Sequence, residues 1–449
     1  MGIEEKTEIP TEAAAVVQPL NLAAAPAFAE ASADGIALEA VVNGGVTSAL
    51  GFVAAGIHAG VRKDPRRLDM ALVVADEPAA CAAVFTKNIF CAAPVTVDRA
   101  QLDGVSYGTA RALVVNSGNA NAATGEPGIA AAYETARIVG DALGCPSNEV
   151  MVASTGVIGV PLDTAPFEEA MPAIQAKLAR DGGHDAACAI MTTDTHSKET
   201  AFSFSGEDIG YAGCTFTVGG MAKGSGMIMP DVATMIACVT TDAPVLPDVL
   251  HDALVRVAGK TFNKITVDSD TSTNDSCFLF ANGAAAKGMP AFEPGSPALA
   301  AFEQALLAVC TSLARAMAAD GEGATRLITV RVAGAANASD ADAAARTVAN
   351  SPLVKTAIFG HDANWGRIAA AIGRSGAAFD QYDVDIDIMG MPVLRAGLPI
   401  PFDEEEALRR FERPEIEIDI DLGAGEANAT IWTCDFSHDY VTINGDYRT

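Results

Sequence analysis

The stretch Gly219–Ala243 reads GGMAKGSGMIMPDVATMIACVTTDA, and its character changes from one end to the other. Glycines crowd its first half, a Pro-Asp pair follows, and residues 232–239 form an apolar run. Flexible residues permit tight turns and β-branched residues favour strands, so the order predicts a glycine-rich turn that feeds a core strand. One hydroxyl, that of Thr234, stands inside the apolar run and calls for an explanation.

Thr234 has two interpretations. As a β-branched residue it fits an ordinary buried strand. Alternatively, Ala233–Thr234 is a bond that the chain cuts in itself, which leaves Thr234 as an N-terminal nucleophile whose freed amine is its own general base. Such a site needs no histidine triad. The pattern by itself leaves both interpretations open.

The string KGSGMIMPDVATMIACVTTDA, residues 223–243, closely resembles the self-cleavage signature of the ornithine acetyltransferase family, the bifunctional glutamate N-acetyltransferases of arginine biosynthesis. The resemblance runs from about Gly51 to the C-terminus. It implies autoproteolysis between Ala233 and Thr234. It also implies a ping-pong reaction in which N-acetylornithine acylates Thr234, ornithine leaves and glutamate takes the acetyl group.

Other strings resemble family motifs and imply further roles. STGVIG (154–159) implies that Thr155 and Gly156 stabilise the oxyanion, although a simple glycine turn has the same pattern. MTTDT (191–195), DGEGAT (320–325) and the last six residues imply substrate contacts, although a polar loop, a solvated helix end and a frayed terminus explain them equally well. The substrate-binding residues so implied are Thr192, Lys223, Thr234, Glu322, Asn444 and Thr449. Lys223 has a second candidate role, since a nearby cation favours the neutral, proton-accepting form of the freed amine.

Composition restricts the partners. The 449 residues carry a net charge of −28, which argues against nucleic acid and anionic membranes because both would be repelled. The nine cysteines are scattered and mostly lie in apolar segments, which predicts reduced, buried thiols in a cytoplasmic protein. The six histidines are dispersed, so spacing supports no metal site. We expect no cofactor, and acetyl-CoA is left open as a second acetyl donor.

The N-terminal segment, residues 1–45, has one basic residue, Lys6, against seven acids, and is rich in Ala and Pro. This composition does not fit a mitochondrial presequence, which would be rich in Arg and poor in acids. It predicts a disordered acidic extension. No uninterrupted apolar run in the chain reaches the ~18 residues that a membrane helix needs.

The periodicity of the rest predicts the fold. Short apolar runs predict strands at 70–75, 81–86, 112–115 and 150–153, and helical spacing predicts helices at 129–143, 165–180, 247–259 and 299–317. Ser296 and Pro297, a cap and a first-turn proline, predict the start of the last helix. Residues 265–275 predict a strand that runs into an acidic, hydroxyl-rich loop, and residues 440–443 also have a strand pattern. Alternation at 327–332, 382–388, 416–422 and 429–433 predicts an antiparallel sheet, covered by helices at 338–350 and 404–411.

The expected architecture is a layered α/β sandwich similar to N-terminal-nucleophile hydrolases. A catalytic domain would span 46–325, and a smaller α+β C-terminal domain, 326–449, would return its tail to the active site. The resemblance implies α and β chains from one precursor, assembled as an α2β2 heterotetramer. Two rivals share parts of this pattern: a self-cleaving aminopeptidase or amidase of similar fold, and an uncleaved binding protein.

Overall fold

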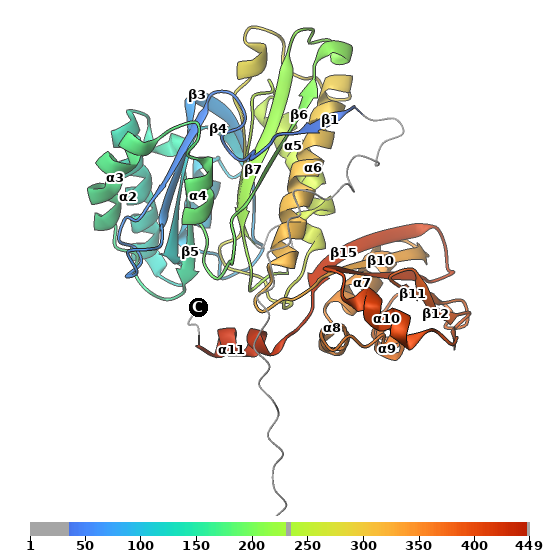
Figure 1. Cartoon of the computed structure of the whole chain (residues 1–449). Coiled ribbons are helices and arrows are strands. Elements are labelled where there is room, and N and C mark those ends of the chain that lie inside the picture. The colour runs from blue at the N-terminus through green and yellow to red at the C-terminus, as the bar shows by residue number, and fades with distance from the viewer. Residues whose placement is uncertain (1–35, 230–234, 447–449) are drawn as a thin grey trace, which may run out of the picture.

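The computed structural model describes residues 36–229 and 235–446, and two separate β-sheets organise them (Figure 1). The larger sheet has nine strands within the described residues, in the order β1-β6-β7-β8-β9-β3-β4-β5, with β2 paired to β3. The strands are β1 (Leu38–Ala40), β2 (Phe52–Ile57), β3 (Met70–Phe85), β4 (Tyr107–Asn119), β5 (Val150–Val157), β6 (Lys198–Ser205), β7 (Thr215–Lys223), β8 (Ile236–Thr241) and β9 (Ser276–Ala281). The pairs β4–β5 and β8–β9 are parallel, and the other pairs of this sheet are antiparallel.

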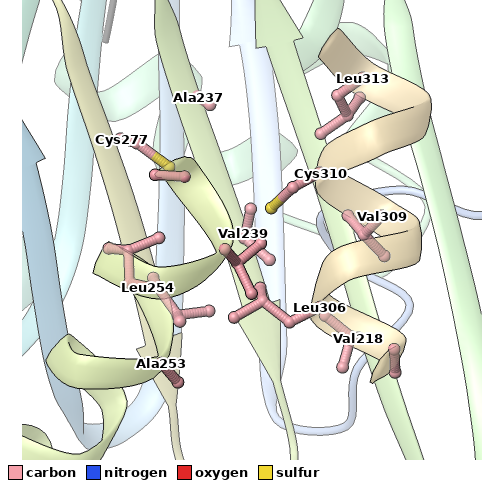
Figure 2. Close-up of a cluster of buried hydrophobic side chains, with 14 of the residues drawn as sticks. Val218, Ala237, Val239, Ala253, Leu254, Cys277, Leu306, Val309, Cys310 and Leu313 are labelled. Atoms are coloured by element: carbon pink, nitrogen blue, oxygen red, sulfur yellow. The ribbon is translucent and has the colours of Figure 1, made fainter. Parts of the chain in front are cut away.

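Two helices cover one face of the larger sheet. Side chains of α5 (Pro247–Lys260) and α6 (Pro297–Ala319) meet those of β7, β8 and β9 in a buried apolar cluster, in which Leu254, Leu306 and Val239 take part (Figure 2). The predicted start of α6 is confirmed, since Ser296 Oγ accepts a hydrogen bond of 3.1 Å from the Leu299 N–H. This helix is also long and apolar enough to cross a membrane, but 67% of its most apolar window is buried inside the protein.

The other half of the sheet carries its own helices. Residues of α1 (Ala93–Gln101) and α2 (Gly125–Leu143) pack on β5, while α3 (Ala165–Lys177) and α4 (Gly183–Ala189) pack on β2. A third apolar core joins residues of β2, β4 and β5 to residues of β7, β8 and β9, so the sheet folds over and its two halves face each other. The predicted layered α/β sandwich is therefore confirmed, and α6 and α2 are its outer layers (Figure 1).

The predicted pair of strands at 70–75 and 81–86 is wrong, because β3 runs through both as one strand. Its register shifts between Val74 and Ala79, and the residues between them include an exposed Asp-Glu-Pro sequence that resembles a turn. A β-bulge places such residues outside the ladder without ending the strand. The strands predicted at 112–115 and 150–153 are likewise parts of longer strands, and the Thr-Gly pair at 155–156 lies inside β5 rather than in the simple glycine turn that its pattern also allowed.

The predicted glycine-rich turn is partly wrong as well. Gly219 and Gly220 lie inside β7, where close packing requires them. A Cβ at Gly219 would lie 2.1 Å from the Gly45 carbonyl oxygen, and one at Gly220 would lie 3.1 Å from the side chain of Leu313. The run that follows the gap at 230–234 is the core strand β8, as expected.

The smaller sheet has six strands among the described residues, in the order β13-β12-β11-β14-β10-β15. They are β10 (Leu327–Ala335), β11 (Asp385–Ile388), β12 (Met391–Arg395), β13 (Leu398–Pro399), β14 (Glu415–Asp421) and β15 (Ala427–Cys434), and the helices α7 (Ala338–Ala349), α8 (Pro352–Phe359), α9 (Trp365–Gly373) and α10 (Glu404–Phe411) accompany them. The expected antiparallel sheet is wrong in one place, because β10 and β14 pair in parallel. The division into domains at residues 325 and 326 stays a prediction, which limited proteolysis would test.

Two predicted strands are absent where we expected them. Residues 440–443 belong to the helix α11 (His438–Asp446), and within 265–275 one bridge pairs Ile265 with Trp432. Both segments are rich in β-branched residues, but strand propensity requires a sheet edge to pair with, and α11 passes below the ends of the larger sheet (Figure 1). Short 3-10 turns at Ser147–Glu149, Glu207–Ile209, Phe262–Lys264 and Ala284–Ala286 complete the described elements.

Candidate functional site

One cavity of about 230 Å³ brings together the predicted site residues that the structure describes. Its lining includes all six of them, which are Thr155, Gly156, Thr192, Lys223, Glu322 and Asn444. They come from five separate parts of the chain: the end of β5, the loop before β6, the end of β7, the turn after α6, and α11. The remaining predicted residues, Ala233, Thr234 and Thr449, lie outside the described residues.

Thr155 and Gly156 lie where β5 runs parallel to β4, with Thr155 level with Ser117 and Gly156 level with Gly118. Gly156 has φ of +133°, a conformation that favours glycine, and a Cβ there would lie 2.4 Å from the Gly118 carbonyl carbon. No other residue fits this close approach of two strands. The hydroxyl of Thr155 and the backbone of Gly156 thus reach the cavity wall together.

Lys223 ends β7 and points its amine at the same wall, with Nζ 3.5 Å from Thr155 Oγ1. Its side chain is buried, and burial lowers the pKa of its amine, an effect that the Lys198 charge reinforces. The carboxylates of Asp194, Asp275 and Glu322 act in the opposite direction. The amine therefore loses its proton more easily than an exposed lysine does.

Glu322 and Asn444 form the opposite side of the cavity. The Asn444 amide nitrogen donates a hydrogen bond of 2.7 Å to Glu322 Oε2, so α11 is tied to the turn after α6. Gly226 leaves room for this pair, because a Cβ there would lie 2.4 Å from the Glu322 carboxyl group. The prediction that the C-terminal segment returns to this region rests on Asn444, since the last three residues are not described.

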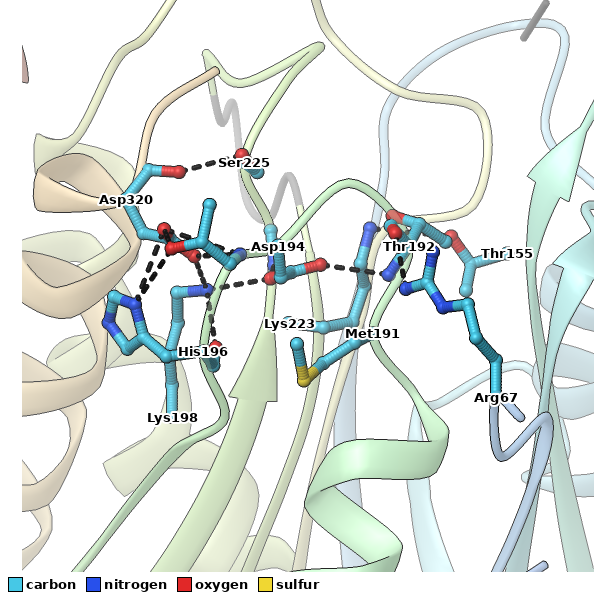
Figure 3. A network of polar contacts seen from close by, with 12 residues as sticks. Arg67, Thr155, Met191, Thr192, Asp194, His196, Lys198, Lys223, Ser225 and Asp320 are labelled. Atoms are coloured by element: carbon cyan, nitrogen blue, oxygen red, sulfur yellow. Dashed lines mark hydrogen bonds and ion pairs between the residues drawn. The ribbon is translucent and has the colours of Figure 1, made fainter. Parts of the chain in front are cut away.

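A buried ionic network supports the cavity from behind (Figure 3). Lys198 Nζ lies 2.7 Å from Asp194 Oδ1 and 2.6 Å from Asp320 Oδ2, and its side chain is fully buried. Asp194 also accepts hydrogen bonds from the Thr192 N–H (2.9 Å) and the Gly224 N–H (2.7 Å). The network therefore fixes the backbone beside two cavity residues, Thr192 and Lys223.

The charges of this network stabilise each other. Burial by itself would raise the pKa of Asp194, but the Lys198 and Lys223 ammonium groups and two hydrogen bonds hold it well below its usual value. The pKa of Asp320 is also lowered, since His196 and Lys198 outweigh its burial. Burial would lower the pKa of Lys198, yet the two carboxylates raise it. All three groups are thus charged at neutral pH.

Asp268 anchors the glycine-rich segment on the other side of the cavity. Its carboxylate accepts hydrogen bonds from the Met227 N–H (2.6 Å) and the Ile228 N–H (2.9 Å), and its burial raises its pKa. The next residue, Ser269, has φ of +73°, which favours glycine. Ser269 therefore holds a backbone conformation that favours glycine, at some cost in strain.

Sequence reasoning missed the polar residues that hold the cavity rather than line it. Asp194 and Lys198 stand four apart in and after the MTTDT string, for which the resemblance implies substrate contacts, and their opposite charges were the available signal. Asp320 opens the DGEGAT string, but the resemblance implies no role for it. The lining residues Tyr440 and Asn274 were missed too, because nothing in the local pattern distinguishes them from ordinary loop residues.

The fold and the site together define an enzyme of the layered α/β sandwich class, with a preorganised cavity that combines hydroxyl, glycine backbone, amine and carboxylate groups. Comparison with known proteins narrows this class. The ArgJ family model matches residues 53–449, so this chain belongs to the ArgJ family.

Individual relatives agree with this assignment. The chain is 50% identical to the arginine biosynthesis bifunctional protein ArgJ of Symbiobacterium thermophilum over 407 residues, which cover 90% of this chain and 99% of the relative. It is 46% identical to the protein of the same name from Thermosynechococcus vestitus, over 91% of this chain and 99% of that one. Among solved structures it resembles ornithine acetyltransferase complexed with ornithine from Mycobacterium tuberculosis, with 38% identity, a TM-score of 0.40, and coverage of 44% of this chain and all of that chain.

Proposed function

We propose that this acyltransferase of arginine biosynthesis transfers the acetyl group of N-acetylornithine to glutamate through an acetyl-Thr234 intermediate, after the chain has cut itself between Ala233 and Thr234. The observation that carries the proposal is the single cavity that collects the six described residues to which the family resemblance gives a role. They come from five segments far apart in the sequence, and the Thr234 segment joins two strands, β7 and β8, that pair with each other.

Self-cleavage would begin when the Thr234 hydroxyl attacks the Ala233 carbonyl carbon. The C–N bond breaks as the acyl group moves to the threonine oxygen, and the nitrogen keeps its own hydrogen, takes up the proton that the hydroxyl loses and becomes the free amine. Water then hydrolyses the ester and releases the Ala233 carboxylate. The new amine serves as the general base for the Thr234 hydroxyl in the transfer reaction.

Each acyl step passes through a tetrahedral intermediate that carries a negative oxygen. The Thr155 hydroxyl and the Gly156 N–H are the donors for that oxygen, and one such donor contributes about 3 kcal/mol to transition-state stabilisation. Because β4 and the tight Gly156–Gly118 approach already hold these groups, little reorganisation is needed during the reaction. The same donors serve both self-cleavage and transfer.

The two ends of the cavity suit an amino-acid substrate. Glu322 offers a carboxylate to an ammonium group, and Lys223 offers a cation to a carboxylate. Asn444 supplies both donors and acceptors from its amide. Lys223 has a second possible task, because a positive charge near the free amine of Thr234 keeps that amine neutral at pH 7.

Two measurements test the proposal. N-terminal sequencing of the purified protein is expected to find a fragment that starts at Thr234, and Thr234→Ala is expected to leave one chain without activity. Labelled N-acetylornithine, supplied with glutamate, is expected to yield labelled N-acetylglutamate. An intact single chain, or release of free acetate with no labelled N-acetylglutamate, would contradict the proposal, and the second result would favour the aminopeptidase or amidase alternative.

Three finer features belong to the same proposal. The reaction requires no cofactor, and steady-state assays with acetyl-CoA in place of N-acetylornithine test whether it is a second donor. We place the enzyme in the cytoplasm, where the nine free thiols stay reduced. We expect the α and β chains to assemble as an α2β2 heterotetramer, which native mass spectrometry measures.

A further inference from the structure

The dipeptide Asn274–Asp275 lies directly before β9, and both residues are buried, with exposed fractions of 7% and 2%. β9 runs parallel to β8, with Ser276 level with Ile236. Asp275 therefore stands beside Met235, the residue that follows the proposed nucleophile in the chain. The family resemblance assigned no role to either residue of this dipeptide.

Asn274 holds the strand that carries the oxyanion donors. Its amide nitrogen donates to two carbonyl oxygens, those of Ala120 (2.5 Å) and Ser154 (2.7 Å). The Ser154 carbonyl belongs to the peptide bond that leads into Thr155. Asn274 Oδ1 in turn accepts a hydrogen bond of 2.6 Å from the Thr273 hydroxyl. The amide is fully engaged, and its orientation is fixed.

Asp275 holds the backbone that leads from the proposed nucleophile into β8. The Ser276 N–H, next in the chain, donates to the Met235 carbonyl oxygen at 2.8 Å. Hydrogen bonding from the Met235 N–H is also among the effects that oppose the raised pKa of the Asp275 carboxyl group. The Met235 backbone is thereby held to the start of β9, and the Met235 nitrogen is bonded to the carbonyl carbon of Thr234. Asp275 is itself anchored, because its own carbonyl oxygen accepts from the Thr86 N–H at 2.9 Å.

The sheet by itself does not set the distance between nucleophile and oxyanion donors. The nucleophile precedes β8 and the donors lie on β5, and the strands β9, β3 and β4 separate the two in the sheet order. At about 4.8 Å per strand, small changes of twist over four strand spacings would shift the two groups relative to each other. A direct link between them removes that freedom.

We propose that Asn274 and Asp275 are positioning residues which, as adjacent residues, hold the Ser154–Thr155 peptide and the backbone of Met235, the residue after Thr234 in the chain, at one fixed separation. The inference rests on the proposed function and names two residues that serve it without contacting the substrate's reacting atoms. The link acts through backbone groups, so it is present both before self-cleavage and afterwards, when Thr234 has become a chain end. A chain end needs such a clamp, because termini fray unless they are tied down.

Burial raises the pKa of Asp275 well above its usual value, although the Lys223 charge and the neighbouring hydroxyls oppose the effect. Its Oδ2 has no hydrogen-bond partner within residues 36–229 and 235–446. An asparagine at this position would keep an oxygen that can accept from the Met235 N–H, but it has no acid proton. Asp275→Asn therefore distinguishes a positioning role from an acid–base role.

The test compares four variants of the full chain in self-cleavage and in transfer. Asn274→Ala and Asp275→Ala are expected to slow both the maturation rate and kcat by about 10- to 100-fold, with KM within threefold, since a shift of ~1 Å costs about 100-fold. Asp275→Asn is expected to stay within about threefold of the wild type in both rates. Thr240→Val is the matched control, because it also removes a buried hydrogen bond, 2.6 Å from Thr240 Oγ1 to the Val46 carbonyl oxygen, and is expected to keep both rates at a comparable loss of Tm.

Several results would overturn the inference. These are alanine variants with unchanged rates, a rise in KM at constant kcat, an Asp275→Asn variant as slow as Asp275→Ala, or an equal slowing in Thr240→Val. If the alanine variants do not fold, Asp275→Glu replaces them. It keeps the acid but displaces the acceptor by one methylene, so slowing supports the inference and wild-type rates refute it. Wild-type protein without a Thr234 fragment would instead contradict the proposed function itself.

Discussion

Replacing Lys198 by methionine is expected to remove the cation that two buried carboxylates share. Lys198 lies 2.7 Å from Asp194 and 2.6 Å from Asp320, and the three side chains are exposed by 0%, 0% and 4%. Methionine has nearly the same length, so the change leaves charges unbalanced without opening a large cavity. Removing one partner of a buried ion pair costs about 3–5 kcal/mol of unfolding free energy.

The loss of unfolding free energy in Lys198→Met is expected to depend on pH, and the pKa shifts determine the direction of this dependence. In the wild type the folded pKa values of Asp194 and Asp320 are lowered, so their contribution is complete above the unfolded value near ~4 and is lost as pH falls. Without Lys198, burial dominates and raises both values. The variant then binds protons on folding and is favoured by acid. The gap between wild type and variant is therefore smallest near pH 4 and largest near pH 8.

Urea unfolding at pH 5 and pH 8 measures both effects. Lys287→Met is the matched control, because Lys287 pairs with Glu77 at 3.5 Å while both side chains are more than three-quarters exposed. Exposed pairs of this kind contribute about 0–1 kcal/mol. An equal loss in the two variants, or a loss in Lys198→Met that does not grow with pH, would refute the assignment of this network as a buried, mutually stabilised one.

Three further predictions follow from the site and the core. Thr155→Ala is expected to slow both self-cleavage and turnover by about 100- to 1,000-fold, and an unchanged rate of either process, measured by gel densitometry and steady-state assay, would remove Thr155 from that process. Deleting residues 445–449 is expected to raise KM for N-acetylornithine and glutamate with self-cleavage intact, whereas lost cleavage would make the tail structural. Burial raises the pKa of Asp242 to about 6, so this group lowers the free energy of unfolding by about 3 kcal/mol as pH rises from 4 to above 6. Asp242→Asn is expected to flatten the fall of unfolding free energy with pH. Equal slopes in wild type and variant, measured by unfolding at several pH values, would contradict this prediction.

The sequence by itself determined the elements whose signals are local. Ser296 and Pro297 marked the start of α6, and the alternation at 416–422 marked β14. The first pattern reflects contacts within a few residues, and the second reflects a strand that turns one face to the core. Both kinds of pattern can be read directly from the order of the residues. The family resemblance is of the same kind, since it compares strings position by position, and the family assignment confirmed it.

Other features depended on partners that are distant in the chain. Residues 440–443 had a strand pattern, yet they form part of α11, because the described structure offers them no sheet edge there. The two runs within β3 looked like separate strands, since only the paired neighbours β4 and β9 show that the chain continues through a bulge. Periodicity reports which side of an element is buried, but not what covers it.

The candidate site likewise contains residues that the sequence identified and residues that only the structure identified. Motifs pointed to the residues that line the cavity, whereas the structure was needed to find those that hold it in place. Lys198 binds Asp320 across 122 positions, and Asn274 binds Ser154 across 120. A buried charge or amide is stable only when a partner meets it, and that partner is selected by the folded sheet rather than by sequence spacing. The chain order therefore determined which groups are available, and the folding-over of the large sheet decided which of them meet.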